Sequence, residues 1–291
     1  MRLSTSTSIM DRYQKAQGAV SMRDCILRCH KAGYRVLDMN CHDMSNPGMP
    51  LAQDDWEDWT REIHDLAQEL DIEFSQSHAH FYNFLNPCIE NGDWHDEMIR
   101  RSIIASGILG VKWMTMHAST ETDTLGYSAR RSKAGNMAYF PKYFDLAFQN
   151  NVGVVLENMY DAKPTQRTFT AAPDDLIDLV DSFQDERVQI CWDFGHGNLV
   201  GIDQRVSLRQ VGKRLKSTHI ADNHGVRDEH LLPFYGDMDW ESLMHTLVEI
   251  GYTGDFTYEI TPFLDRVPVN ARDGALKHTV EVGECLLNMA K

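Results

Sequence analysis

Four residues with metal-binding side chains each stand at the end of a short, apolar segment of the sequence. These segments have the β-branched and aromatic composition of strands, and the four residues are Glu157, Asp193, His219 and Glu259. Three carboxylates and one imidazole offer hard oxygen and nitrogen atoms, a ligand set that suits a single divalent cation. If the strands are neighbours in one parallel sheet, their ends bring these four side chains to one rim.

Two histidines extend this pattern to the preceding segments. His78 and His117 each follow a strand-like run, so six successive predicted strands end in His, Asp or Glu. A lone loop histidine is more often a surface or core residue than a ligand, but six such endings in succession are improbable by chance. We therefore expect His78 and His117 to lie at the same site and to contact the substrate.

Strand-like and helix-like segments alternate along the chain. Strands are expected near residues 2–6, 35–39, 72–77, 112–116, 152–156, 188–192, 215–219 and 255–259. Amphipathic helices, with apolar residues at i, i+3 and i+4, are expected near 22–32, 54–70, 95–108, 136–150, 173–183, 204–213, 239–250 and 272–289. Eight alternating pairs in 291 residues predict a (β/α)8 TIM barrel with a single domain over residues 1–291.

The longest predicted loops all follow strands, at 78–94, 117–135, 157–172 and 220–238. In a barrel these loops lie on the C-terminal face, where active sites are built. They contain six basic residues, namely Arg130, Arg131, Lys133, Lys163, Arg167 and Arg227. A phosphate or carboxylate on the substrate explains these cations, and so does simple solvated loop charge. The aromatic residues Phe81, Tyr82, Phe84 and Trp113 flank the third and fourth strand ends, where they either stack on the apolar face of a substrate or belong to the core.

Composition limits the kinds of partner and the cellular compartment that we expect for this protein. The formal charge is −15, from 28 Lys and Arg against 43 Asp and Glu, which disfavours binding to nucleic acid. The six cysteines lack zinc-ribbon spacing, and we interpret them as reduced, intracellular thiols. The sequence shows neither a signal peptide nor an apolar run of the ~20 residues that a membrane span needs. We expect a cytoplasmic protein without a membrane partner.

Six segments carry a resemblance to a known family: SQSHAHF (75–81), MTMHAS (114–119), VLENMY (155–160), CWDFGHGN (191–198), the run 218–240 and TYEI (257–260). They resemble the xylose isomerase-like barrel superfamily, specifically the sugar phosphate isomerase/epimerase group that includes tagatose and psicose 3-epimerases. The family commonly has a Gly-Glu pair where this chain has Phe234-Tyr235, and a proline where it has His80. Both departures fall on the substrate face and bear on which substrate is bound.

The resemblance implies a metal site and a small-molecule carbohydrate substrate. One divalent ion (Mn, Co or Mg, with Zn possible) would be held by Glu157, Asp193, His219 and Glu259, and relatives are often dimers or tetramers. His196 and Arg227 match positions that contact substrate oxygens. His196 stands in a Gly-His-Gly run, where a packing role is the alternative.

Glu157 and Glu259 have a defined chemical role if the protein is a sugar epimerase. Epimerisation beside a ketone removes a weakly acidic proton, and a divalent cation lowers the barrier by stabilising the enediolate. Glu157 and Glu259 would be both ligands and the two proton-transferring bases. The alternative for this pair is an ordinary ion pair at the barrel mouth.

Other reaction classes compete with a sugar isomerase. Endonuclease IV-type repair enzymes bind three zinc ions through nine residues, and each has a candidate here: His78, His117, Glu157, Asp193, His196, His219, Asp228, His230 and Glu259. The charge of −15 and the lack of a basic stripe disfavour a DNA substrate. A metal-dependent lyase, a dehydratase, a C-glycoside-cleaving enzyme and a non-catalytic binding barrel are further alternatives. One metal ion per chain favours the sugar enzyme, whereas three zinc ions favour the nuclease.

Overall fold

The structure, a computed structural model, describes residues 1–10, 20–123, 126–161, 166–261 and 263–290. Eight parallel strands form its main sheet in the order β10-β1-β2-β3-β4-β7-β8-β9. They are β1 (Leu3–Ser6), β2 (Val36–Asn40), β3 (Glu73–His78), β4 (Trp113–Met116), β7 (Gly153–Glu157), β8 (Val188–Asp193), β9 (Leu215–His219) and β10 (Phe256–Tyr258). Ile220 N donates to Thr257 O at 2.8 Å and a parallel bridge joins Ile220 to Tyr258. These contacts close the sheet, so the predicted TIM barrel is confirmed.

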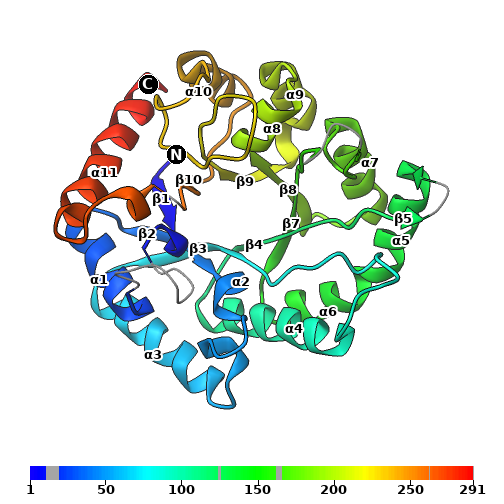
Figure 1. The fold of residues 1–291 in the computed structure, drawn as a ribbon, viewed down its shortest axis with the longest axis horizontal. Helices are drawn as coiled ribbons and strands as arrows, with labels where there is room; N and C mark the ends of the chain where they lie inside the picture. Colours follow the sequence, from blue (N-terminus) through cyan, green and yellow to red (C-terminus); the bar gives the residue numbers. More distant parts are fainter. Residues whose placement is uncertain (11–19, 124–125, 162–165, 262, 291) are drawn as a thin grey trace.

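Helices surround the strands as an outer ring (Figure 1). They are α1 (Met22–Ala32), α2 (Cys41–Met44), α3 (Trp56–Glu69), α4 (Gly92–Ile108), α5 (Ala129–Tyr139), α6 (Pro141–Gln149), α7 (Pro173–Phe183), α8 (Phe194–Val200), α9 (Gln204–Val211), α10 (Trp240–Glu249) and α11 (Arg272–Met289). Five 3₁₀ turns accompany them in the described residues: η1 (Thr7–Ile9), η2 (Pro50–Ala52), η3 (Gly212–Arg214), η4 (Leu264–Arg266) and η5 (Val269–Ala271). No helix of the described residues is both long and apolar enough to span a membrane.

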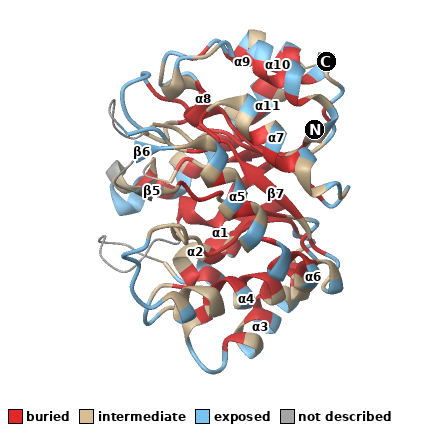
Figure 2. Ribbon diagram, turned by 90° about the vertical axis from the view of Figure 1, so that its right-hand side faces the viewer, coloured by how far each residue is buried: buried red, intermediate tan, exposed pale blue. Residues whose placement is uncertain are grey.

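The core lies between the strands and the inner faces of the helices, where Figure 2 shows continuous burial. Large side chains such as Trp192, Trp240 and Phe256 are at most 1% exposed there. All six cysteines are free thiols.

The helix predicted near 136–150 differs from the structure. Two helices occupy this region, because α5 starts already at Ala129 and α6 restarts at Pro141. Ser128 Oγ accepts a hydrogen bond from Arg131 N and so caps α5, and proline is favoured in the first turn of a new helix. The predicted loop 117–135 is consequently shorter. It contains the antiparallel pair β5 (Thr122–Asp123) and β6 (Gly126–Tyr127).

The parallel strands bring the predicted site residues to one end of the barrel. His78, Glu157, Asp193 and His219 are the last residues of β3, β7, β8 and β9. His117 and Glu259 directly follow β4 and β10. All six therefore lie at the C-terminal end of the barrel.

Candidate active site and metal centre

The four predicted metal ligands converge on one point. Glu157, Asp193, His219 and Glu259 each offer a ligand atom, and these four atoms all lie within 4.8 Å of one another. His219 Nδ1 is 2.9 Å from Glu157 Oε1 and 3.2 Å from Glu259 Oε2. The first three residues are almost completely buried, whereas the Glu259 side chain is 18% exposed.

The charge balance of this cluster fits a cation. Asp193 Oδ1 accepts a hydrogen bond from His196 N at 2.6 Å and caps α8. Its other oxygen, Oδ2, is buried and has no hydrogen-bond partner among the described residues. Buried polar atoms are nearly always satisfied, and three carboxylates around one imidazole leave negative charge uncompensated. Oxygen and nitrogen donors in this arrangement suit a divalent ion.

The pKa values report the same shortage of positive charge. Burial raises the pKa of Asp193 to about 7, although nearby His196 opposes this rise. Burial also acts to raise the pKa of Glu157, but His219 and His117 outweigh it and hold that pKa well below the ordinary value. For His219, burial acts to lower the pKa, yet Cys191, Glu259 and Glu157 raise it well above the usual range. A bound cation would supply the positive charge that the raised pKa values of Asp193 and His219 otherwise draw from protons.

Two histidines form a second group around Glu157. His117 Nε2 is 2.8 Å from Glu157 Oε2, and His78 Nε2 is 3.0 Å from His117 Nε2. The three residues together form another geometrically possible metal-binding group. The predicted placement of His78 and His117 beside the ligand cluster is thus what the structure has.

A third group lies on the facing wall. His230 Nε2 is 2.9 Å from Asp228 Oδ2, and His196 Nε2 is 3.6 Å from the same oxygen. Burial acts to lower both histidine pKa values. Asp193 and Asp228 nevertheless raise the pKa of His196 to about 10, and Asp228 raises that of His230 to about 9. Asp228 is therefore placed to orient both imidazoles.

A cavity of about 280 Å³ joins these groups. Its lining includes Glu157 and Glu259 of the first group, all of the second and third groups, and Phe81, Met159 and Tyr160. A neighbouring cavity of about 420 Å³ shares part of this lining and adds Asn40, His42, Asp43 and Thr261. The combined space is polar on the metal side and aromatic at Phe81, whose ring centroid is 4.2 Å from that of His117.

The structure does not bring every predicted residue to the site. Arg227 has a side chain that is 70% exposed, pairs with Glu229 at 3.2 Å, and is absent from the lining of both cavities. Three other predicted loop cations are engaged in ion pairs elsewhere: Arg131 with Glu121, Lys133 with Asp178 and Arg167 with Asp161. Arg130, Arg131 and Lys133 belong to α5, and Lys163 lies outside the described residues.

Three of the aromatic residues also lie away from the cavity. Tyr82 and Phe84 pack against Tyr139. Of the two alternatives for Trp113, the stacking role does not hold, because Trp113 is the first residue of β4 and lies at the other end of the barrel. Only the end of that strand, three residues later, reaches the C-terminal face.

The two departures from the family pattern do not line either of the two cavities. His80 Nε2 is 2.8 Å from His95 Nδ1 and its ring contacts Trp94 edge-on. Phe234 and Tyr235 are each 51% exposed, and Tyr235 reaches His278 at 3.2 Å.

Two positioning residues could not be recognised as such from the sequence. Asn158 Oδ1 accepts from Asp193 N at 2.6 Å, and Asn158 Nδ2 donates to Asp193 O at 2.9 Å. Asp222, which is fully buried, accepts from Trp240 Nε1 at 2.8 Å and Phe234 N at 3.0 Å. Asn158 fixes the ligand-bearing end of β8, and Asp222 fixes the loop that carries Asp228 and His230. A polar residue next to a predicted ligand was the available signal for Asn158.

Residues 26–279 match the model of the xylose isomerase-like TIM barrel family. The chain therefore belongs to that family. The uncharacterized protein y4fM of Sinorhizobium fredii is 27% identical over 214 residues, which make up 70% of this chain and 63% of that protein. The match thus spans less than two thirds of that relative's length.

Solved structures, a sugar epimerase among them, share the fold. A D-psicose 3-epimerase crystallised in the presence of D-fructose has a TM-score of 0.75 and 13% identity, with 100% of both chains covered. The IOLI protein with a binding zinc atom has a TM-score of 0.74 and 18% identity, over 98% of this chain and 99% of that chain. Such low identities establish the common architecture only.

Proposed function

We propose that the protein is a divalent-metal-dependent isomerase or epimerase of a sugar or sugar phosphate, which acts by two-base proton transfer through an enediolate. The observation that carries this proposal is that Glu157 and Glu259 both lie beside His219 Nδ1, at 2.9 and 3.2 Å. Sugar epimerases among the structural neighbours support it.

The residues divide the reaction between them. Glu157 and Glu259 come from strands three positions apart around the barrel, so they approach a substrate in the cavity from different sides. One carboxylate removes the proton beside the ketone, and the other returns a proton to the opposite face. His117 Nε2 and His219 Nδ1, each within 2.9 Å of a Glu157 oxygen, hold that carboxylate in place.

Other residues bind and orient the sugar. His196, Asp228 and His230 form a polar wall that suits hydroxyl groups, and Phe81 offers an apolar surface. A divalent cation held by Glu157, Asp193, His219 and Glu259 would supply electrostatic stabilisation of the enediolate oxygens. Manganese, cobalt, magnesium and zinc are all compatible with this donor set.

A direct assay tests the proposal. Protein loaded with Mn²⁺ is incubated with D-fructose, D-psicose, D-tagatose and their phosphates, and the products are separated by chromatography. We expect one of these ketoses to be converted to an epimer or isomer, and EDTA-treated protein to be inactive. Failure of metal-loaded protein to exchange any carbon-bound proton of the panel with solvent would contradict the proposal.

The zinc-dependent AP endonuclease is a second candidate, which the three neighbouring clusters favour. His78 and His117 join Glu157 on one side, and His196 and His230 join Asp228 on the other. Seven of the nine potential ligands line one cavity, and the other two, Asp193 and His219, belong to the same four-residue group as Glu157 and Glu259. Zinc content distinguishes the two functions, because three ions per chain favour the nuclease and one ion favours the sugar enzyme.

Homo-oligomerisation and a cytoplasmic location stay predictions from the sequence. Size exclusion chromatography with light scattering tests the first of these.

A further inference from the structure

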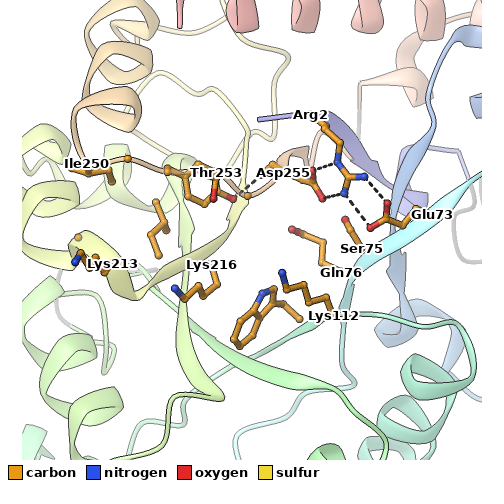
Figure 3. Close-up of a pocket in the computed structure, with 16 residues that line it drawn as sticks. Arg2, Glu73, Ser75, Gln76, Lys112, Lys213, Lys216, Ile250, Thr253 and Asp255 are labelled. Atoms are coloured by element: carbon orange, nitrogen blue, oxygen red, sulfur yellow. Dashed lines mark hydrogen bonds and ion pairs between the residues drawn. The ribbon is translucent and has the colours of Figure 1, made fainter.

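A large cavity lies at the opposite end of the barrel from the candidate active site. Its volume is about 550 Å³, within the range of roughly 300–1,000 Å³ that is typical of small-molecule sites. Its lining comes from the N-terminal ends of β1, β3, β4, β9 and β10 and the segments that precede them (Figure 3). The proposed function makes no use of this end.

More cationic than anionic side chains line this cavity. The cations are Arg2, Lys112, Lys213 and Lys216, and the carboxylates are Glu73 and Asp255. Arg2 binds both carboxylates, with Nε 2.8 Å from Asp255 Oδ1 and Nη2 3.1 Å from Glu73 Oε1. The two acidic groups are therefore already engaged by one guanidinium.

The three lysines have no counter-ion in the part of the chain that the structure describes. No ion pair or side-chain hydrogen bond of the described residues involves Lys112, Lys213 or Lys216. Figure 3 shows Lys112 and Lys216 along the lower side of the cavity in that view, away from the ion pairs of Arg2. A local excess of cations in a chain of net charge −15 creates a positive potential that attracts an anion.

Uncharged donors add to this lining. Ser75 is only 8% exposed, and its Oγ has no hydrogen-bond partner among the described residues. Trp113 is partly exposed, and no hydrogen bond of the described part of the chain uses its indole N–H. Because a buried hydroxyl nearly always has a partner, a bound ligand or water is expected beside Ser75.

We propose that this N-terminal cavity binds a phosphorylated small molecule. Phosphate carries close to two negative charges and several acceptor oxygens, which match two or three lysine ammonium groups with further donors nearby. Lys112 and Lys216 contact the phosphate, and Lys213 at the edge contacts a second anionic group. Trp113 offers an aromatic face for an attached ring. Lys216 and His219 are three residues apart on β9, or about 10 Å at strand geometry, so the two sites are separate.

Calorimetric titration of the full chain at low ionic strength tests this proposal, with sodium pyrophosphate and ADP as probes. We expect saturable binding of one molecule per chain. The Lys112→Gln/Lys216→Gln double variant should bind about tenfold or more weakly, because two charge-assisted contacts are lost. Tighter binding of ADP than of pyrophosphate would show that the ring contacts the protein. Equal binding would restrict the site to the phosphate groups.

Two control variants show whether binding depends on this cavity in particular. Lys31→Gln/Lys277→Gln removes the same charge from exposed lysines elsewhere and should bind both probes as the unchanged protein does. His219→Ala disables the metal centre and should also retain binding, which separates this site from the proposed active site. The proposal is overturned if neither probe binds at millimolar concentration, if the Lys112→Gln/Lys216→Gln protein binds normally, or if either control loses binding equally.

Discussion

His219 Nδ1 lies 2.9 Å from Glu157 Oε1, although their strands β9 and β7 are separated by β8. The two side chains therefore meet near the end of β8, whose last residue is Asp193. Closure of the barrel brings Glu259 Oε2 to 3.2 Å from the same imidazole nitrogen. This arrangement gives the first two predictions.

Removal of the imidazole should weaken metal binding and leave the barrel folded. In His219→Ala the only nitrogen ligand of the cluster is lost, whereas residues on the C-terminal face contribute more to function than to stability. We expect metal content after dialysis, measured by elemental analysis, to fall well below that of the unchanged protein. The circular dichroism spectrum should stay the same. Full turnover by metal-free protein would refute the metal-dependent mechanism.

Turnover in heavy water should place deuterium at the carbon that receives the proton, which is the inverted carbon of an epimerisation or the reduced carbon of an isomerisation. Proton return by a second base draws on protons that exchange with solvent, and NMR of the product locates the label. Glu259→Gln keeps the size and one oxygen but loses the proton transfer, so kcat should fall by about 10²-fold or more. A product free of deuterium would instead indicate hydride shift or cleavage of another bond.

Duplex DNA that contains an abasic site should be neither bound nor incised at physiological ionic strength. The net charge of −15 opposes a polyphosphate, and Arg227 on the loop beside the cavity is already paired with Glu229. Electrophoretic assays at several salt concentrations, with zinc-loaded protein, measure both properties. Efficient incision together with three bound zinc ions would make the nuclease the preferred function.

Replacement of Asp222 should destabilise the protein more than any exposed acidic substitution. Its buried carboxylate accepts four hydrogen bonds, from Asn223 N, Phe234 N, Met238 N and Trp240 Nε1. Asp222→Ala leaves these donors unsatisfied and should lower the free energy of unfolding by about 3 kcal/mol or more. Urea unfolding measures the loss, and Asp237→Asn, an exposed change in the same loop, should have little effect. Equal stability of the two variants would contradict the structural role.

Asp96 should contribute stability that disappears in acid. Burial acts to raise its pKa, but hydrogen bonds from Lys142, Tyr139, Tyr143 and Tyr82 outweigh burial and lower the pKa to about 2. A folded-state pKa below the unfolded value of about 4 means that the contribution is complete above pH 4 and is lost as the pH falls through 2. Asp96→Asn should therefore reduce stability at pH 7, by about 1–2 kcal/mol.

The pH dependence supplies the control for this prediction. The difference between Asp96→Asn and the unchanged protein should shrink as the pH falls from 4 towards 2, and Asp54→Asn at an exposed position should show no such trend. A difference that is constant with pH would mean that the carboxylate charge is not the source of the stability.

The barrel and the group of candidate metal ligands could be predicted from local sequence pattern. Strand and helix periodicities are local properties of the sequence. A residue at the end of a parallel strand lies at the C-terminal face of the barrel, independently of the conformation of the loops. Glu157, Asp193, His219 and Glu259 could therefore be identified without knowledge of any contact. The location of His78 and His117 at this face could be predicted by the same rule.

The directions of loop side chains, and the distant residues that meet, depend on tertiary packing. Arg227 and Asp228 are adjacent in sequence, yet Arg227 faces solvent and Asp228 lines the cavity, because the conformation of this loop depends on hydrogen bonds to buried Asp222 from residues up to 18 positions later. The lysine-lined cavity likewise joins Lys112 to Lys213 and Lys216 through barrel closure. Local pattern cannot predict such contacts, because they depend on how separate elements pack together.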